Sequence, residues 1–326
     1  ARTGSGRKSN NFGGSRAANG VMVAAFLLVA AAWLGWLGPF SRAAWDAEES
    51  GRDALSRLLA PTPEREDLVL LGIDEASLAL SGASEAEIAE AEVLEWMGQR
   101  FPWDRRVWAA VIDRLGEAGV RVIVLDLIFA EPSGDPEADA AFAAAVARHR
   151  EKVVLGTLWA PSVDGAMELK EPLPELVWAD EGDDTSVGFV NFWADARDGM
   201  VRKADYRLSP REANLLERRS DETVHDSLSA AVARKLGAEV PEGALRLRMA
   251  RRVIDGQAVV SAAYPPRSIY EIFLPDLWRQ NYGEGRSLAG KVVLVGPAAS
   301  RLQDKQASSS GFLLGAQLHL QALGCL

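Results

Sequence analysis

The sequence contains few of the residues from which enzyme and metal sites are built. Its only cysteine is Cys325, which excludes an internal disulfide and any cysteine-based metal site. Its three histidines, His149, His225 and His319, are far apart and lack the spacing of metal ligands. Neither a G-x-S-x-G elbow nor a strand followed by G-x-G-x-x-G is present. We therefore expect no metal, no cofactor and no catalytic activity.

Acidic residues outnumber basic ones outside the first residues of the chain. The 46 acidic residues outnumber the 36 lysines and arginines, which gives a net charge of -10. Residues 1–19 carry four cations and no acid, so the rest of the chain is more acidic still. An acidic body of this kind argues against nucleic acid as a partner.

Strongly apolar runs long enough to cross a membrane are absent with one exception, residues 20–38, which read GVMVAAFLLVAAAWLGWLG and carry no charge. As a helix this run would span about 28 Å, close to the hydrocarbon thickness of a bilayer. A secretory signal peptide is the alternative, with Ala43 as a small residue before a cleavage point. The cations before the run and the acids after it predict a single-pass bacterial inner-membrane protein. The leader, 1–19, would be cytoplasmic and the main domain periplasmic or extracellular.

Residues 39–65 are predicted to form a stalk, helical over 41–60, and residues 66–326 a single extracytoplasmic domain. Four short apolar runs in that domain are typical of strands buried on both faces. Helical patterns separate the first three runs, and Asp104 and Asp135 are the predicted caps of the two intervening helices. The four predicted strands are 68–74, 122–125, 153–158 and 291–299.

The predicted fold is α/β: a largely parallel sheet flanked by helices, with an antiparallel hairpin extension, preceded by the transmembrane helix. The hairpin is expected over 186–208, with its turn at 195–199. Short strands are expected over 245–264 and irregular chain over 161–185 and 300–311. Helices are expected over 78–100, over 221–236 with Asp221 as cap, over 270–278, and over 312–326, the last one amphipathic.

Six segments in a consistent order resemble the type-two CHASE domain, an extracellular sensory domain associated with cyclases and histidine kinases. The resemblance rests on GID-x-x-S, G-x-x-F-P-W-x-R, LDLIFAEP, G-F-V-N followed by D-G-x-V-R, GKVVLVG, and Asp304 followed by G-x-x-x-H. These segments begin at Gly72, Gly98, Leu125, Gly188, Gly290 and Asp304. The acidic insertion 78–97 and Tyr264-Pro265-Pro266 depart from the pattern. The resemblance implies sensing and an α/β domain over about 66–324.

Asp74 and Asp126 follow two predicted parallel strands, at the sheet edge where open α/β folds bind ligands. If those strands are neighbours, two carboxylates there could hold a cation or act as an acid and base. The alternative, which we favour, is that each caps a following turn.

Trp103 and Arg105 flank the start of the helix below that edge. Arg105 could bind an anionic ligand or, as we favour, pair with Asp74 or Asp126. Asp198 and Arg202 are expected to fix the 195–199 turn. Asp304 belongs to the motif that ends with His319, and His319 is expected to be packed or capping.

We therefore expect a membrane-anchored, non-catalytic sensor that relays binding through the stalk and the final helix. The expected partners are the lipid bilayer and either other transmembrane proteins or a second copy, with a small-molecule ligand of unknown identity. The alternative is a non-sensing accessory subunit that docks on a larger membrane complex. A hydrolase using Asp74 and Asp126 is a weaker third possibility.

Overall fold

The computed structural model describes residues 29–30, 38–58, 62–177 and 186–326. The chain forms two compact units, residues 1–59 and 60–326. The described part of the first unit is mainly α2 (Gly38–Leu58), which confirms that the predicted stalk is helical. Among the described residues no helix combines the length and apolarity that a membrane span requires. The predicted span, 20–38, lies almost entirely outside the described residues.

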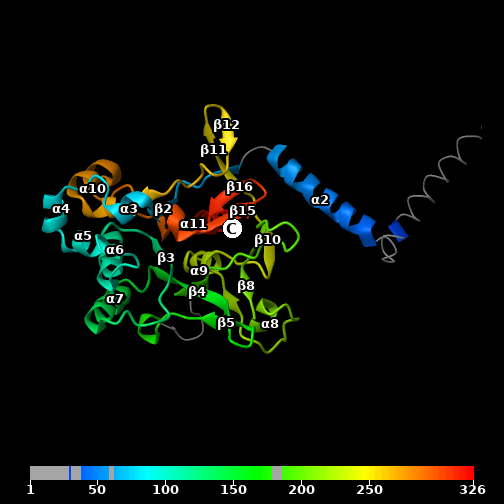
Figure 1. Cartoon of the computed structure of the whole chain (residues 1–326), viewed down its shortest axis with the longest axis horizontal. Coiled ribbons are helices and arrows are strands. Elements are labelled where there is room, and N and C mark those ends of the chain that lie inside the picture. The colour runs from blue at the N-terminus through cyan, green and yellow to red at the C-terminus, as the bar shows by residue number, and fades with distance from the viewer. Residues whose placement is uncertain (1–28, 31–37, 59–61, 178–185) are drawn as a thin grey trace, which may run out of the picture. The chain divides into compact units, whose positions relative to one another are not determined.

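A seven-stranded sheet forms the centre of the second unit (Figure 1). Its order is β13-β2-β14-β3-β4-β5, and β6 also pairs with β4. All pairings are parallel except that between β4 and β5, which confirms the largely parallel sheet. The strands are β2 (Leu68–Ile73), β3 (Val122–Ile128), β4 (Val153–Pro161), β5 (Met167–Lys170), β6 (Val187–Phe189), β13 (Arg267–Ser268) and β14 (Val292–Pro297).

Helices cover both faces of this sheet because its central strands are apolar on both sides. Alternate residues of β3, such as Ile123 and Leu125, pack against α6 (Arg105–Glu117) and α7 (Pro136–Arg148). The residues between them, Val122 and Val124, pack against α9 (Leu228–Lys235) and α11 (Gly315–Leu323). Successive side chains of a strand point to opposite faces, so each strand contributes to two cores.

The strand order corrects one prediction. The predicted strands that end near Asp74 and Asp126, now β2 and β3, are not neighbours, because β14 pairs with both and lies between them. The strand that separates them, β14, comes about 170 residues after β3 in the chain, and local sequence patterns do not reveal such a long-range pairing.

The antiparallel hairpin predicted over 186–208 is wrong, although its turn exists. β6 pairs in parallel with β4, whereas β7 (Lys203–Asp205) pairs with β10 (Ala244–Arg246). The antiparallel extension of the sheet is β5, in a segment expected to be irregular. The other antiparallel pairs are β8 (Arg207–Leu208) with β9 (His225–Asp226), β11 (Ala250–Ile254) with β12 (Gln257–Val259), and β15 (Lys305–Ser308) with β16 (Gly311–Leu314).

Several helix predictions also need correction. The single helix expected over 78–100 is three short ones, α3 (Glu75–Ala79), α4 (Glu85–Glu90) and α5 (Glu92–Met97). α9 begins after Ser227, not Asp221, because 225–226 pair with β8. α11 is shorter than expected and is buried on every side rather than amphipathic. The remaining helical segments are α8 (Pro210–Ala213), η1 (Pro174–Leu176), η2 (Ile269–Phe273), α10 (Pro275–Tyr282) and η3 (Ser300–Leu302), and β1 (Thr62–Pro63) pairs with β11.

Gly188 allows β6 to lie directly against the start of α9. A Cβ at this position would come within 2.6 Å of Leu228 Cα and of the Ser227 carbonyl oxygen. Because both are backbone atoms, they cannot move aside as a side chain would. Gly188→Ala should therefore lower the free energy of unfolding of the second unit by about 1–3 kcal/mol.

Chemical denaturation of the full chain measures this loss. Gly51→Ala in α2 makes the same chemical change with no atom within 4 Å of the new Cβ, and serves as the control. Equal stability of Gly188→Ala and the wild-type protein would contradict the close contact.

Candidate functional site

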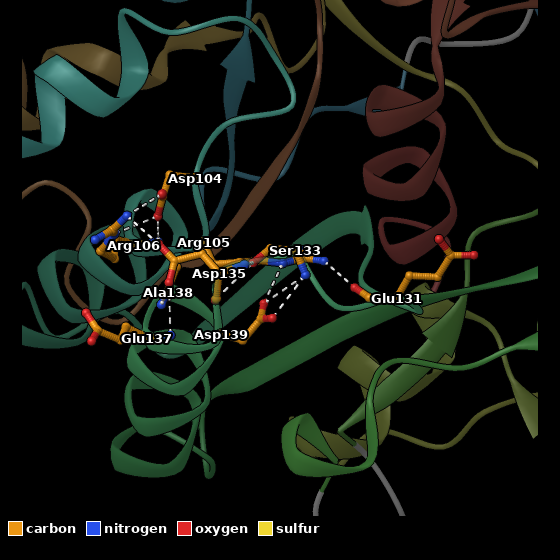
Figure 2. Close-up of polar contacts among 9 residues, drawn as sticks. All are labelled: Asp104, Arg105, Arg106, Glu131, Ser133, Asp135, Glu137, Ala138 and Asp139. Atoms are coloured by element: carbon orange, nitrogen blue, oxygen red, sulfur yellow. Dashed lines mark hydrogen bonds and ion pairs between the residues drawn. The ribbon is translucent and has the colours of Figure 1, made fainter.

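The N-termini of α6 and α7 lie side by side and are joined by Arg106 (Figure 2). Asp104 caps α6 by accepting the Arg106 N–H at 2.8 Å, and Asp135 caps α7 by accepting the N–H groups of Glu137 and Ala138. The Arg106 guanidinium bonds both Asp104 oxygens, at 2.9 and 2.7 Å, and Asp135 Oδ2 at 3.0 Å. Both predicted caps are confirmed, and one arginine links them.

Arg105 holds the loop that leaves β3. Its Nη2 donates to the Glu131 carbonyl at 2.9 Å, its Nε lies 3.4 Å from Asp139 Oδ1, and its guanidinium covers the Phe129 ring at 4.5 Å. Asp139 in turn accepts the Ser133 N–H at 3.0 Å. The predicted pair with Asp74 or Asp126 is wrong, because α6 packs on the face of the sheet opposite to Asp126. Burial lowers the pKa of Arg105, and the charge of Asp139 opposes that shift.

A cavity of about 750 Å³ opens beside this network. It lies at the carboxyl end of β3, between the segment that precedes α6 and the loop that joins β3 to α7. One wall is aromatic, and the other combines charged side chains with the backbone of the loop. Its lining residues include Gln99, Phe101, Trp103, Arg105, Trp108, Phe129, Glu131, Leu158 and Lys170.

Trp103 lines this cavity, and its indole N–H is a buried donor without a partner in the described part of the chain. The side chain is only 4% exposed, and within the described residues its Nε1–H has no acceptor. The ring packs against Phe101 and Trp108, with centroids 5.5 Å apart in each pair. A buried indole N–H usually has a hydrogen-bond acceptor, so a ligand that supplied one would satisfy this donor.

Asp74 serves the local structure. It caps α3 by accepting the Ser77 N–H at 2.8 Å and the Ser77 hydroxyl at 2.6 Å, and it also accepts the Ser268 hydroxyl. With β14 between them, Asp74 and Asp126 do not form the carboxylate pair that the sequence suggested.

Asp126 lies in a different cluster, with Asp304 and His319. His319 Nε2 is 3.7 Å from Asp126 Oδ1, and the Asp126 carboxylate makes no hydrogen bond within the described residues. Burial raises the pKa of Asp126 well above its usual range, and the charge of Asp304 adds to the shift. Burial also raises the pKa of Asp304 to about 6, against hydrogen bonds from the backbone N–H groups of Ala316 and Gly315. It lowers the pKa of His319 to about 3.

Two glycines allow the backbone to approach these carboxylates. A Cβ at Gly315 would lie 2.4 Å from Asp304 Oδ1, and one at Gly296 would lie 3.1 Å from Asp126 Oδ2. The G-x-x-x-H segment therefore places Gly315 against Asp304 and, one helical turn later, His319 against Asp126.

Asp198 and Arg202 fix a turn, as predicted. The Arg202 guanidinium bonds both Asp198 oxygens, at 3.0 and 2.7 Å, and Asp198 also accepts the Met200 N–H. The turn itself is closed by the Gly199 N–H, which donates to the Asp195 carbonyl at 2.8 Å.

The sequence analysis did not assign a role to two residues that line the cavity, Phe129 and Lys170, or to Asp139 beside it. Asp139 is the partner of Arg105, Phe129 lies under its guanidinium, and Lys170 reaches the cavity from β5. Asp139 had a local signal, since it lies on the first turn of a helix that starts at a predicted cap. Lys170 had none, because its position depends on the unexpected strand β5.

Within the described ranges no group of three or more His, Cys, Asp or Glu side chains is arranged to hold a metal ion. The lining of the cavity combines aromatic side chains with charged ones, the kind of lining that organic ligands use in proteins generally.

Comparison with known proteins assigns a family to this chain. A family model described as the CHASE2 domain matches residues 23–326. The chain belongs to the CHASE2 domain family. This confirms the resemblance drawn from the six sequence segments, and CHASE2 is a family of extracellular sensory domains. Searches of curated proteins and of solved structures give no match.

The ion pair of this CHASE2 domain between Arg105 and Asp139 gives a stability prediction. Arg105→Gln should lower the free energy of unfolding by about 1–3 kcal/mol, because it removes charged hydrogen bonds from a side chain only 14% exposed. Asp139→Asn and the double variant complete a mutant cycle, with an expected coupling of about 0.5–3 kcal/mol.

Arg286→Gln is the matched control. Arg286 pairs with Glu284 on the surface and is 78% exposed, so its loss should change stability by less than about 0.5 kcal/mol. Additive effects in the Arg105–Asp139 cycle would show that the contact contributes nothing to stability.

Proposed function

We propose that this CHASE2 domain is a membrane-anchored, extracytoplasmic sensor whose ligand binds in the cavity beside Trp103 and Arg105. The observation that carries the proposal is the position of this cavity at the carboxyl end of β3, where open parallel sheets bind ligands. Family membership supports sensing over the alternative of a non-sensing docking subunit. It equally supports a non-catalytic role.

The lining of the cavity supports a small organic ligand with an apolar part and a hydrogen-bond acceptor. Phe101 and Trp103 offer apolar surface, and the buried Trp103 Nε1–H would become a donor for a ligand that reaches it. The Arg105 guanidinium already has Asp139 and the Glu131 carbonyl as partners, so this proposal does not use it to bind an anion. Figure 2 shows the Glu131 side chain pointing away from that guanidinium, which leaves its carboxylate available for a basic group on the ligand.

Ligand binding here would act on the loop that joins β3 to α7. Arg105 and Arg106 fasten this loop to the start of α6, so a ligand that contacts both sides favours one arrangement of the two helices. A ligand shifts such an equilibrium only by its difference in affinity for the two arrangements. We place the relay to the membrane in α2 and α11, and the anchor in residues 20–38.

The cavity predicts how Trp103→Phe affects ligand binding. A fragment library is screened by ligand-observed NMR against the full chain, and hits are ranked by the thermal stabilisation they produce. A hit at 100 times its Kd should stabilise the wild-type protein by about 2.7 kcal/mol. Trp103→Phe keeps the aromatic wall but removes the donor, so it should weaken binding by about fivefold, the equivalent of one hydrogen bond.

Trp278→Phe provides the control for that substitution. Trp278 packs beside Tyr282 and under Arg114, and it does not line the cavity. Hits that bind Trp103→Phe as tightly as the wild-type protein, or that lose affinity in Trp278→Phe, would place the binding site elsewhere.

The predicted orientation in the membrane is tested by protease protection. With the leader in the cytoplasm, protease added to intact spheroplasts should digest the second unit, and sealed inside-out vesicles should protect it. Digestion in the vesicles with protection in the spheroplasts would reverse the orientation. Full release into the medium after spheroplasting would favour the signal-peptide interpretation of residues 20–38.

A further inference from the structure

The cluster of the buried His319 with the half-buried Asp126 and Asp304 lies outside the lining of the cavity and makes few hydrogen bonds. It joins three elements: the end of β3, the segment before β15 and the middle of α11. Within the described residues, Asp304 Oδ2 and His319 Nδ1 are buried without a partner, and Asp126 has only the 3.7 Å contact with His319. An ionised Asp126 in such surroundings lacks the donors that would replace water, so its neutral acid is favoured.

In the part of the chain that the structure describes, no neighbouring side chain supplies a compensating charge. β14 has no titratable residue, α9 presents Ser229, whose hydroxyl bonds the His319 carbonyl, and the segment before it presents Phe192 to the imidazole ring. Nearby cations have other partners: Arg301 lies 3.6 Å from Glu75, Lys305 lies 3.4 Å from the Ser300 hydroxyl, and Arg202 bonds Asp198. The charge state of the cluster therefore depends on protons exchanged with solvent.

Asp304 is the member of the cluster whose neutral and ionised forms are each favoured by part of its surroundings. Burial favours its neutral form, while the N–H groups of Gly315 and Ala316, at the start of α11, favour the carboxylate. Gly315 leaves no space for a side chain between the helix and this carboxyl group. Any change in the hydration or charge of Asp304 is thus applied directly to the first turn of α11.

We propose that Asp304 is a proton-operated switch on α11, and that external acidity is an input of this domain separate from any ligand in the cavity. With Asp304 protonated, one neutral acid lies against the start of α11 and another, Asp126, lies against His319. When Asp304 releases its proton to solvent, a negative charge remains beside Asp126 under the helix, and the first turn of α11 opens more readily.

The direction of the pH dependence follows from the three groups. Asp304 and Asp126 bind protons more tightly in the folded protein, so the stability they contribute is complete below about pH 4 and is lost as pH rises; for Asp304 the loss runs from about pH 4 to just above pH 6, where it is complete. His319 binds its proton less tightly when folded, so its contribution is lost as pH falls from about 6.5 toward 3. Because these effects oppose each other, Asp304 must be isolated by comparison with a variant.

Hydrogen exchange of the α11 amides in the full chain provides that comparison. Asp304→Asn fixes the neutral state, while Asp126 and His319 titrate in both proteins. The ratio of α11 opening in the wild-type protein to that in Asp304→Asn should rise about tenfold between pH 5 and pH 7.5, the increase expected for a carboxyl group with a folded pKa near 6. A ratio that stays constant over this range overturns the proposal.

Asp276→Asn is the control, because Asp276 lies on the exposed first turn of α10. The ratio of α11 opening in the wild-type protein to that in Asp276→Asn should not change with pH. If Asp304→Asn fails to fold, carbon-13 NMR of the aspartate carboxyl groups measures the titration of Asp304 in the wild-type protein. A titration midpoint near pH 6 supports the switch, and a midpoint below about 4.5 overturns it.

Discussion

The burial of α11 is the constraint on which the rest of the second unit depends. All nine of its residues, Gly315–Leu323, are buried, although the helix contains two glutamines and a histidine. Each buried polar group needs a partner, and Gln317 and Gln321 find theirs in the segment around β11. Gln317 donates to the carbonyls of Ser261 and Ala263, and Gln321 bonds the N–H and the carbonyl of Ala250. The helix thereby fastens the small antiparallel strands to the parallel sheet.

The two sites of interest lie on opposite faces of the same strand. Asp126 faces α11, while the cavity begins at Leu127 and continues along Phe129 and Glu131. The pairing of β3 with β4 shifts register between Leu125 and Ile128, so the strand is irregular where the two sites meet. A ligand in the cavity and a proton at the acidic cluster would therefore act on one short stretch of backbone, without contact between them.

The sequence predicted best what depends on neighbouring residues. Short apolar runs identified β2, β3, β4 and β14, and the caps Asp104 and Asp135 are correct because capping is decided within three residues. What failed depends on residues far apart in the chain. The insertion of β14 between β2 and β3 separated Asp74 from Asp126, and the pairing of 225–226 with β8 moved the start of α9 to Ser227.

The candidate site shows the same limit at the level of one side chain. Trp103 and Arg105 were chosen correctly as neighbours of the sheet edge, but the partner of Arg105 was chosen on the wrong face. A carboxylate at the end of β3 must point either to α6 or to α11, and the alternation from Val122 and Val124 assigns Asp126 to α11. With Asp126 facing away, the guanidinium uses the acid on its own side of the sheet, Asp139, one turn into α7. Side chains alternate between the two faces of a sheet. Once the helices on each face are known, this alternation thus decides which charged side chains can pair.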